Sequence, residues 1–378
     1  MPKRILMVIM AYHPITGGAE RQAKKLAEEL VKIGCQVDVL TMRKNGLKHC
    51  ETINGVNVFR TGFLKRKILQ YSSVFGMYRF ILKNRSKYDV VHIHQGLLAA
   101  FAATLAANKI GLPSIIKIGN SGYKFDLELL RKKYWLGSWF VKSVIRNCTK
   151  FIAITPQIKD EMLKYGILED RVEYIPNGVK IPKFIKKLEN RQQLGFVDEE
   201  VIGICVGRLM ETKNHTFLLN LIASTDLGNV KILLLGEGPL QSEIRSIISD
   251  LDLGGKVELK GNVDNIEDYL QAADFFILPS KTEGLSNALI EAMAYQLPVL
   301  VSDIPGNCHV VGSDNHSGYL CSLSKIQDWR RCLFEIVRDD NLRSQMGQSA
   351  KNRVEDKFSL PTIIKEYLML YDRLIAIK

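Results

Sequence analysis

Short apolar runs alternate with segments of helical pattern along most of the chain, and this alternation constrains the fold more than any other feature. In the amino-terminal half, strands are predicted at 4–10, 36–41, 56–60, 90–94, 114–118 and 151–155. In the carboxyl-terminal half, strands are predicted at 201–206, 231–235, 257–260, 275–278 and 298–301. Helical patterns fill the gaps. Strands that alternate with helices favour parallel sheets, so the sequence predicts an α/β fold.

The length of 378 residues favours two domains. A turn-rich stretch at 175–179 is followed by a segment that contains Lys and Pro, and we expect the interdomain linker there. The predicted domains are 1–180 and 181–358, and the tail at 359–378 is expected to form a terminal helix.

Two glutamates lie eight residues apart, Glu283 before a predicted helix and Glu291 on its second turn. Either Ser286 or Asn287 can cap that helix. Free backbone N–H groups at the positive end of the helix dipole belong to Gly284, Leu285 and Ser286. The segment therefore combines an anion cradle with two carboxylates that can accept hydrogen bonds from hydroxyls, as a phosphate joined to sugars requires.

Two cations follow the predicted strand at 201–206. Arg208 comes directly after its carboxyl end, and Lys213 and Asn214 are expected to open the next helix. Ligands of parallel α/β sheets bind at that edge. An arginine fork and a lysine point charge there suit a diphosphate.

These motifs come in the order found in the retaining glycosyltransferases of family 4, also called glycosyltransferase group 1. The matching residues are Gly17-Gly18-Ala19-Glu20-Arg21, Gly207-Arg208-Leu209 with Lys213-Asn214, Gly236-Glu237-Gly238-Pro239, and Glu283-Gly284 through Glu291-Ala292-Met293-Ala294. The chain resembles this family over nearly its whole length. The resemblance implies the GT-B fold, in which two Rossmann-like, doubly wound domains face each other across a cleft. It also implies that the terminal helix packs back on the amino-terminal domain.

The resemblance implies an acceptor-binding amino-terminal domain and a nucleotide-sugar-binding carboxyl-terminal domain. The implied catalytic residues are Arg208, Lys213 and Glu283. The implied donor-binding residues are Gly17, Gly18, Asn120, Gly207, Gly236, Gly284, Leu285, Ser286 and Glu291. Among them, Glu291 would hold the ribose hydroxyls, and Glu283 would bond hydroxyls of the transferred sugar.

Two positions depart from the family pattern. Many members carry a His after the strand that corresponds to 114–118, where this chain has Asn120 as a possible polar substitute. The family often has a Glu near 306–309, and none occurs there in this chain. Both departures concern the handling of the sugar or the acceptor.

No metal and no other cofactor is expected. The Asp-x-Asp spacing of Asp250 and Asp252 fits a turn at a helix end, and His92 and His94 share one strand face without an evident third ligand. Cations and a helix start can stabilise a departing diphosphate without metal. The resemblance implies transfer with retention, in which the leaving diphosphate itself takes the proton of the acceptor.

Charge is distributed unevenly along the chain. Residues 1–180 contain 30 Lys and Arg against 13 Asp and Glu, a balance of +17, whereas residues 181–378 contain 22 against 27, a balance of −5. A basic half favours an anionic partner. An anionic membrane surface is expected rather than nucleic acid, because no helix-turn-helix, zinc-finger or stacking-platform signature is present.

The segment 129–146 is the candidate for membrane contact because it mixes cations with aromatic residues. Its membrane-facing or acceptor-facing residues are predicted to be Arg131, Lys132, Lys133, Trp135 and Trp139. The cations Lys65, Arg66 and Lys67 can add to the same surface. The alternative is an amphipathic helix whose aromatic side chains pack on the sheet. Gly137 weakens a helix by about 1 kcal/mol relative to Ala, so a break is expected there.

The sequence thus predicts a metal-independent, retaining transferase that uses a UDP-hexose or UDP-N-acetylhexosamine donor and a lipid-linked or membrane-near glycan acceptor. We expect a bacterial enzyme of polysaccharide biosynthesis for the cell envelope. Its expected location is cytoplasmic, on the inner face of the cell membrane. Two alternatives remain, a non-catalytic nucleotide-sugar-binding subunit of a transferase complex and a nucleotide-sugar epimerase.

Overall fold

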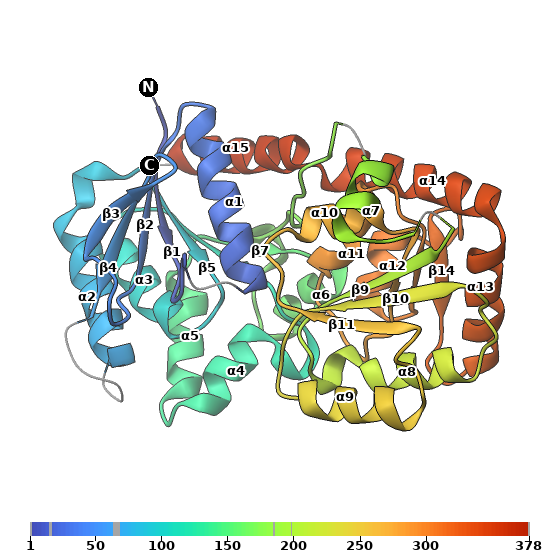
Figure 1. The fold of residues 1–378 in the computed structure, drawn as a ribbon. Helices are drawn as coiled ribbons and strands as arrows, with labels where there is room; N and C mark the ends of the chain where they lie inside the picture. The colour runs from blue at the N-terminus through green and yellow to red at the C-terminus, as the bar shows by residue number, and fades with distance from the viewer. Residues whose placement is uncertain (1, 15–16, 63–68, 184–185, 198, 377–378) are drawn as a thin grey trace. The chain divides into compact units, whose positions relative to one another are not determined.

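The computed structural model describes residues 2–14, 17–62, 69–183, 186–197 and 199–376. The chain divides into two compact units: unit 1 comprises Met1–Gly178 and Pro361–Lys378, and unit 2 comprises Val179–Leu360. Each unit contains one sheet of largely parallel strands with helices packed on it (Figure 1). The predicted α/β fold with two Rossmann-like domains is confirmed.

The sheet of unit 1 has β1 near its centre. Its strands are β1 (Arg4–Val8), β2 (Gln36–Met42), β3 (Cys50–Ile53), β4 (Val56–Thr61), β5 (Val90–His94), β6 (Ser114–Ile118), β7 (Lys150–Ala153) and β8 (Val172–Tyr174). They are ordered β3-β4-β2-β1-β5-β6-β7-β8, with β3 antiparallel to β4 and the other neighbouring pairs parallel. Strand addition changes direction between β1 and β5, which is the topological switch point of this unit.

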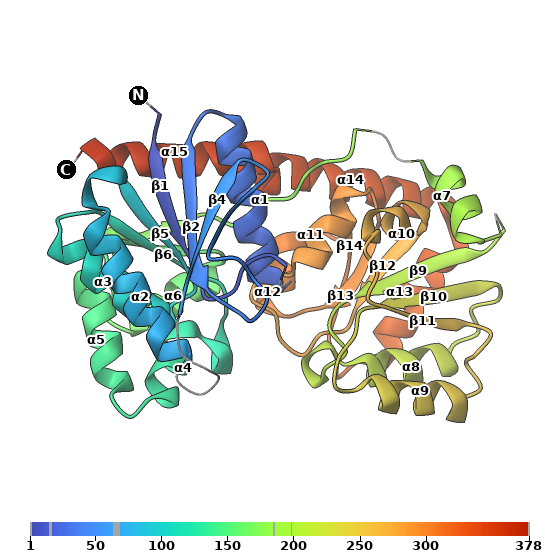
Figure 2. The ribbon, with the colours of Figure 1, turned by 60° about the vertical axis from the view of Figure 1, so that its left-hand side comes forward.

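The helices of unit 1 are α1 (Gly18–Lys32), α2 (Leu69–Lys83), α3 (Leu98–Lys109), α4 (Asp126–Lys133), α5 (Gly137–Asn147), α6 (Pro156–Lys164) and α15 (Leu360–Ala376). Helices α2, α3 and α5 pack side by side (Figure 2). Helix α15 packs against the sheet, where the Tyr371 hydroxyl lies 2.8 Å from Nδ1 of His92 on β5. His92 and His94 share one face of β5, as expected, and their rings stack 4.4 Å apart.

Unit 2 has a second, fully parallel sheet. Its strands are β9 (Val201–Val206), β10 (Val230–Leu235), β11 (Val257–Gly261), β12 (Phe275–Leu278), β13 (Val299–Ser302) and β14 (Gly318–Cys321). They are ordered β11-β10-β9-β12-β13-β14. The switch point lies between β9 and β12. The residues of β12 and β13 are all buried, which explains their continuous apolar sequences.

The helices of unit 2 are α7 (Lys187–Leu194), α8 (His215–Ala223), α9 (Gln241–Asp250), α10 (Ile266–Ala272), α11 (Asn287–Ala294), α12 (Pro305–Val311), α13 (Ile326–Arg338) and α14 (Asp340–Phe358). Helix α8 packs beside α9 and α11 packs on α14 (Figure 2). Asp252 has a left-handed backbone just after α9, so the Asp-x-Asp pair lies at a helix end and turn, as predicted.

Candidate active site

The loops after β9 and β10, at the carboxyl edge of the unit 2 sheet, pack backbone against backbone. Gly236 follows β10 with a φ of +135°, and a Cβ there would lie 2.1 Å from the carbonyl oxygen of Gly207. A Cβ on Gly238 would lie 2.2 Å from the carbonyl oxygen of Leu209. Both contacts require glycine. The close fit holds the backbone on either side of Arg208 at the carboxyl end of β9.

Lys213 and Glu283 form an ion pair beside these loops. The Nζ atom of Lys213 lies 2.5 Å from Oε1 of Glu283, and the two side chains are 16% and 12% exposed. A Cβ on Gly207 would lie 3.2 Å from Cε of Lys213, so glycine leaves room for the lysine. The Ser280 hydroxyl donates to the same Oε1 at 2.7 Å. The predicted catalytic cation and carboxylate are therefore neighbours in a largely buried site.

A chain of buried polar groups supports Glu283 from behind. The Ser302 hydroxyl donates to the Ser280 carbonyl at 2.6 Å, and the Asn307 side chain donates to the Ser302 carbonyl at 3.0 Å. Ser280, Ser302 and Asn307 have no exposed surface. Sequence reasoning did not identify these three residues. The sequence does carry a signal for two of them, because Ser280 follows the apolar strand β12 and Ser302 ends the apolar strand β13.

Helix α11 begins where the sequence predicted. Ser286 is its N-cap, and the Ser286 hydroxyl accepts a hydrogen bond from the Leu289 N–H at 3.4 Å. Gly284 and Leu285 lie in the turn just before it. Glu291 lies on the second turn and is half-buried. The turn, the cap and Glu291 thus follow one another along the chain after β12.

Arg208 differs from Lys213 in its surroundings. Its side chain is exposed, and its guanidinium makes no ion pair or hydrogen bond with the described residues. Helix α8 begins at His215, slightly later than predicted, because Lys213 ends a 3-10 turn and Asn214 is left-handed at φ +57°. Burial, followed by the charge of Lys213, lowers the pKa of His215 to about 4, so this imidazole is neutral at pH 7.

The predicted donor residues of unit 1 follow two strands of its sheet. Gly17 is the N-cap of α1, Gly18 is the first residue of that helix, and both come after β1. A Cβ on Gly17 would lie 2.3 Å from Oε2 of Glu20. Asn120 comes after β6, and its side-chain amide donates to Asp126 at 2.7 Å. The predicted donor residues therefore form two sets, one in each unit.

Two family models match the chain. The model described as Glycosyltransferase Family 4 matches residues 16–181, and the one described as Glycosyl transferases group 1 matches residues 186–353. The chain belongs to the family 4 glycosyltransferases. It is a glycosyltransferase that uses a nucleotide-sugar donor.

The glycosyltransferase is similar to proteins with named activities. A UDP-Gal:alpha-D-GlcNAc-diphosphoundecaprenol alpha-1,3-galactosyltransferase of Escherichia coli is 25% identical, with 82% of this chain and 81% of the relative covered. A sucrose-phosphate synthase from Thermosynechococcus elongatus has a TM-score of 0.80 at 19% identity, with both chains fully covered. Anabaena HepE in complex with UDP and glucose has a TM-score of 0.78 at 18% identity, covering 98% and 99%. These structures show that the glycosyltransferase has the GT-B fold.

The basic, aromatic segment of the glycosyltransferase forms two helices, not one. Helix α4 ends at Lys133, and α5 begins at Gly137, whose N–H donates to the Tyr134 carbonyl at 2.8 Å. A Cβ on Gly137 would lie 2.1 Å from the Arg131 carbonyl oxygen, so glycine lets α5 start close against α4. The expected break therefore lies just before Gly137.

Several aromatic side chains of this region face solvent. Trp135 is 98% exposed and Trp139 is 55% exposed, whereas the ring of Phe140 packs 4.6 Å from that of Phe101. Phe140 is thus half-buried against helix α3, and not against the sheet that the alternative named, and Trp135 faces solvent. We use the name aromatic-basic surface for Arg131, Lys132, Lys133, Trp135 and Trp139, together with exposed Tyr71 of α2, whose ring centre lies 6.4 Å from that of Tyr134. The predicted contributors Lys65, Arg66 and Lys67 lie outside the described residues.

The cations of the aromatic-basic surface have local partners. Arg131 and Lys132 both pair with Glu128, at 2.6 and 3.1 Å. The Lys133 ammonium lies 5.6 Å from the ring centre of Tyr134. These exposed pairs contribute little to stability, and the region keeps an excess of positive charge.

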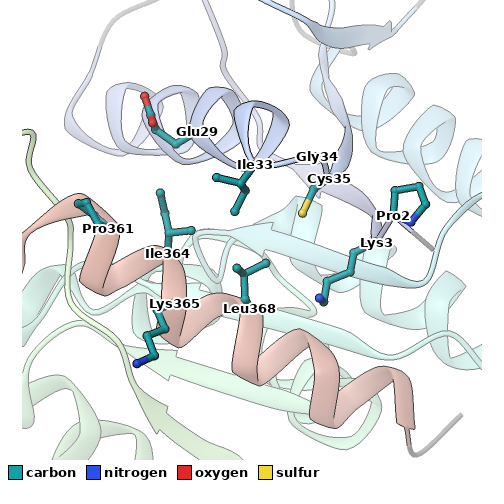
Figure 3. A pocket seen from close by; sticks show the side chains of 10 residues that line it. All are labelled: Pro2, Lys3, Glu29, Ile33, Gly34, Cys35, Pro361, Ile364, Lys365 and Leu368. Atoms are coloured by element: carbon teal, nitrogen blue, oxygen red, sulfur yellow. The ribbon is translucent and has the colours of Figure 1, made fainter.

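A groove of about 480 Å³ lies in unit 1 between the carboxyl end of α1 and α15 (Figure 3). Its lining includes Ile33, Cys35, Ile364 and Leu368. None of the residues that line it belongs to the predicted donor or catalytic sets, so we do not assign the donor to it.

The described residues contain no group of three or more His, Cys, Asp or Glu side chains arranged to hold a metal. Nor, within those same ranges of the chain, is there a helix both long enough and apolar enough to cross a bilayer.

Proposed function

We propose that this glycosyltransferase moves a hexose or N-acetylhexosamine from a UDP donor to a lipid-linked or membrane-near glycan, with retention and without a metal ion. The observation that carries the proposal is the grouping of Arg208, Lys213 and Glu283 at the switch point of unit 2. UDP and a lipid diphosphate acceptor are supported by the name of the Escherichia coli relative, and UDP also by the Anabaena structure, which is a complex with UDP and glucose.

The proposed task of the cations is to neutralise the diphosphate as it leaves. The Arg208 guanidinium offers a planar fork for phosphate oxygens, and Lys213 offers a point charge. The start of α11 adds backbone N–H groups and the positive end of a helix dipole. Charge stabilisation of this kind is usually the largest single contribution to such a reaction, and it needs no divalent ion.

The two carboxylates are assigned to hydroxyl groups of the donor. Glu291 would accept hydrogen bonds from the ribose, and Glu283 would accept them from the transferred sugar. The position of Glu283 is set by Lys213 and by Ser280, which both contact Oε1. A carboxylate held in this way orients the anomeric carbon without taking part in bond formation.

In the proposed reaction the acceptor oxygen attacks the anomeric carbon from the face that the diphosphate leaves. The bond between that carbon and the phosphate oxygen breaks, the bond to the acceptor oxygen forms, and the acceptor proton passes to the departing diphosphate. This scheme differs from that of retaining hydrolases, in which a pair of carboxylates supplies a nucleophile and an acid.

Isotope-labelled UDP-glucose, UDP-galactose and their N-acetylhexosamine counterparts, incubated with the protein and a bacterial membrane extract, test the proposal. We expect label from one donor to enter a lipid-extractable product, in EDTA as well as without it, with an α-linkage in the product. An absolute need for a divalent ion, or a β-linked product, would contradict the mechanism. Tight donor binding without transfer would contradict the activity itself.

We further propose that the aromatic-basic surface contacts the anionic inner face of the cell membrane. Exposed Trp side chains can insert at the headgroup level while the cations bind anionic lipid. We expect co-sedimentation with phosphatidylglycerol vesicles and not with phosphatidylcholine vesicles. Trp135→Ser with Trp139→Ser should abolish it. Phe334→Ser, which removes another exposed aromatic from unit 2, should have no effect. Equal binding by the Trp variant would refute this surface.

A further inference from the structure

Asp126 is a buried carboxylate that joins two loops at the carboxyl edge of the unit 1 sheet. It is the first residue of α4 and has no exposed surface. Its Oδ2 accepts the Gly96 N–H at 2.9 Å, from the loop after β5. Its Oδ1 accepts the Asn120 side-chain amide at 2.7 Å, from the loop after β6. One side chain thus connects the two loops.

The loop after β5 is shaped to let Asp126 approach. A Cβ on Gly96 would lie 2.7 Å from Cδ1 of Ile118 and 3.2 Å from Cβ of Asp126. A side chain at this position would require the end of the Ile118 side chain to shift, so glycine lets the loop pass close to Asp126 without that rearrangement. Burial raises the pKa of Asp126 to about 6, because it outweighs the hydrogen bonds that favour the charged form. The group is mostly ionised at pH 7.

An ionised carboxylate dictates which end of an amide can face it. It accepts hydrogen bonds and has none to give, whereas the two ends of an asparagine amide differ, NH₂ donating and C=O accepting. The NH₂ group of Asn120 must therefore face Asp126. The carbonyl oxygen of Asn120 is left on the other side as an acceptor.

We propose that Asp126 is a positioning residue that fixes the Asn120 amide so that its carbonyl oxygen accepts a hydrogen bond from a hydroxyl of the transferred sugar. This inference rests on the proposed function and on the prediction from the sequence that Asn120 is a donor-binding residue. Its new content is the orientation of that contact. The site selects a sugar that carries a hydrogen-bond donor at this position and discriminates against an analogue in which fluorine replaces the hydroxyl.

Exchanging the two side chains tests the orientation. In Asp126→Asn, the new NH₂ group can face Asn120, which lets the Asn120 amide flip and present its own NH₂ to the sugar. In Asn120→Asp, two carboxylates face each other. The double variant Asn120→Asp with Asp126→Asn restores the pairing. The amide introduced at position 126 can accept the Gly96 N–H with its carbonyl oxygen and turn its NH₂ toward the carboxylate introduced at position 120.

We expect each single variant to lose about 10- to 100-fold in kcat/KM for the accepted donor, as for one lost hydrogen bond at a buried polar site. The double variant should recover most of the loss, so the two effects should not be additive. An additive loss in the double variant, or full activity of Asp126→Asn, would overturn the inference. Absence of transfer by the wild-type protein would instead overturn the proposed function and this inference with it.

A second measurement covers the case in which Asp126→Asn does not fold. Asn120→Ala leaves the Gly96 contact of Asp126 intact. A panel of monodeoxyfluoro analogues of the accepted UDP-sugar is compared between the wild type and Asn120→Ala. We expect one analogue to be rejected by the wild type at least about tenfold more strongly than by the variant, because only the wild type offers the acceptor. Equal discrimination by both proteins would overturn the inference.

Discussion

Arg208→Ala and Lys213→Met should separate catalysis from stability, because the two cations have different surroundings. Arg208 is exposed and makes no ion pair or hydrogen bond with the described residues, so its removal should change the free energy of unfolding by no more than about 0.5 kcal/mol. Lys213 lies 2.5 Å from Glu283 in a largely buried pair. Removing one partner of a fully buried pair costs about 3–5 kcal/mol. With the partial exposure of this pair, we expect about 2–3 kcal/mol.

These magnitudes predict distinct thermal shifts. For a domain of the size of unit 2, 1 kcal/mol corresponds to about 2–4 °C, so Lys213→Met should lower the midpoint of its transition by roughly 4–12 °C. Arg208→Ala should leave it within about 2 °C. Loss of one group that stabilises transition-state charge should lower kcat by about 10²- to 10³-fold in both variants.

Differential scanning fluorimetry and a steady-state transfer assay measure the two quantities. Arg245→Ala is the matched control, because Arg245 is an exposed arginine of α9 that makes no ion pair or hydrogen bond with the described residues. It should behave as the wild type in both assays. Wild-type turnover by Arg208→Ala would refute the assignment of this arginine to the diphosphate. An equal loss of stability in the Arg208 and Lys213 variants would refute the contrast between their surroundings.

Further predictions concern single positions. Gly236→Ala should destabilise the protein by at least about 2 kcal/mol in urea denaturation, since φ is +135° and the new Cβ would clash with a carbonyl, whereas Gly254→Ala, with open space at its Cβ, should change little. Burial lowers the pKa of Lys117 from 10.5 to about 7. Between these two pH values the unfolded protein holds the Lys117 proton and the folded protein releases it. The free energy of unfolding should therefore rise from pH 7 to 10.5, by up to about 1.4 kcal/mol per pH unit. The Lys117→Met variant should be more stable than the wild type at pH 7, and its free energy of unfolding should not rise with pH in this way. If it rises as steeply as in the wild type, Lys117 is excluded as the source of the rise. Ser286→Ala should cost about 1 kcal/mol through loss of the α11 cap, and an unchanged urea midpoint would argue against that cap.

The strands that carry the site could be predicted because they are buried on both faces. The apolar runs at β9, β10 and β12 allow few other assignments, and their carboxyl ends place Arg208 and Glu283 at one edge.

Strands β3, β8 and β14 were missed because their sequences carry weak signals. β3 alternates polar and apolar residues and is half-exposed, although Asn54 and Gly55, with φ of +50° and +82°, are a recognisable hairpin turn. β8 has three residues at the edge of its sheet, and none of them is buried. β14 has four residues and begins at a glycine.

The pairings within the site could not be predicted, because they depend on contacts between distant parts of the chain. Lys213 and Glu283 are 70 residues apart, and Asp126 contacts Gly96 over 30 residues. The sequence pattern places each of these residues near the end of a predicted strand or helix. It does not indicate which other residue each one contacts. Gly137 predicts the break in the basic segment, whereas the close approach of Gly137 to a carbonyl of α4 depends on how the two helices pack.

A crystal structure of the protein with UDP, grown in EDTA, tests the central claim most directly. The account predicts that the diphosphate lies at the start of α11, with oxygens of the β-phosphate in hydrogen-bond contact with the Arg208 guanidinium and the Lys213 ammonium. A diphosphate bound elsewhere, or UDP that binds only when a divalent cation is supplied, would contradict it.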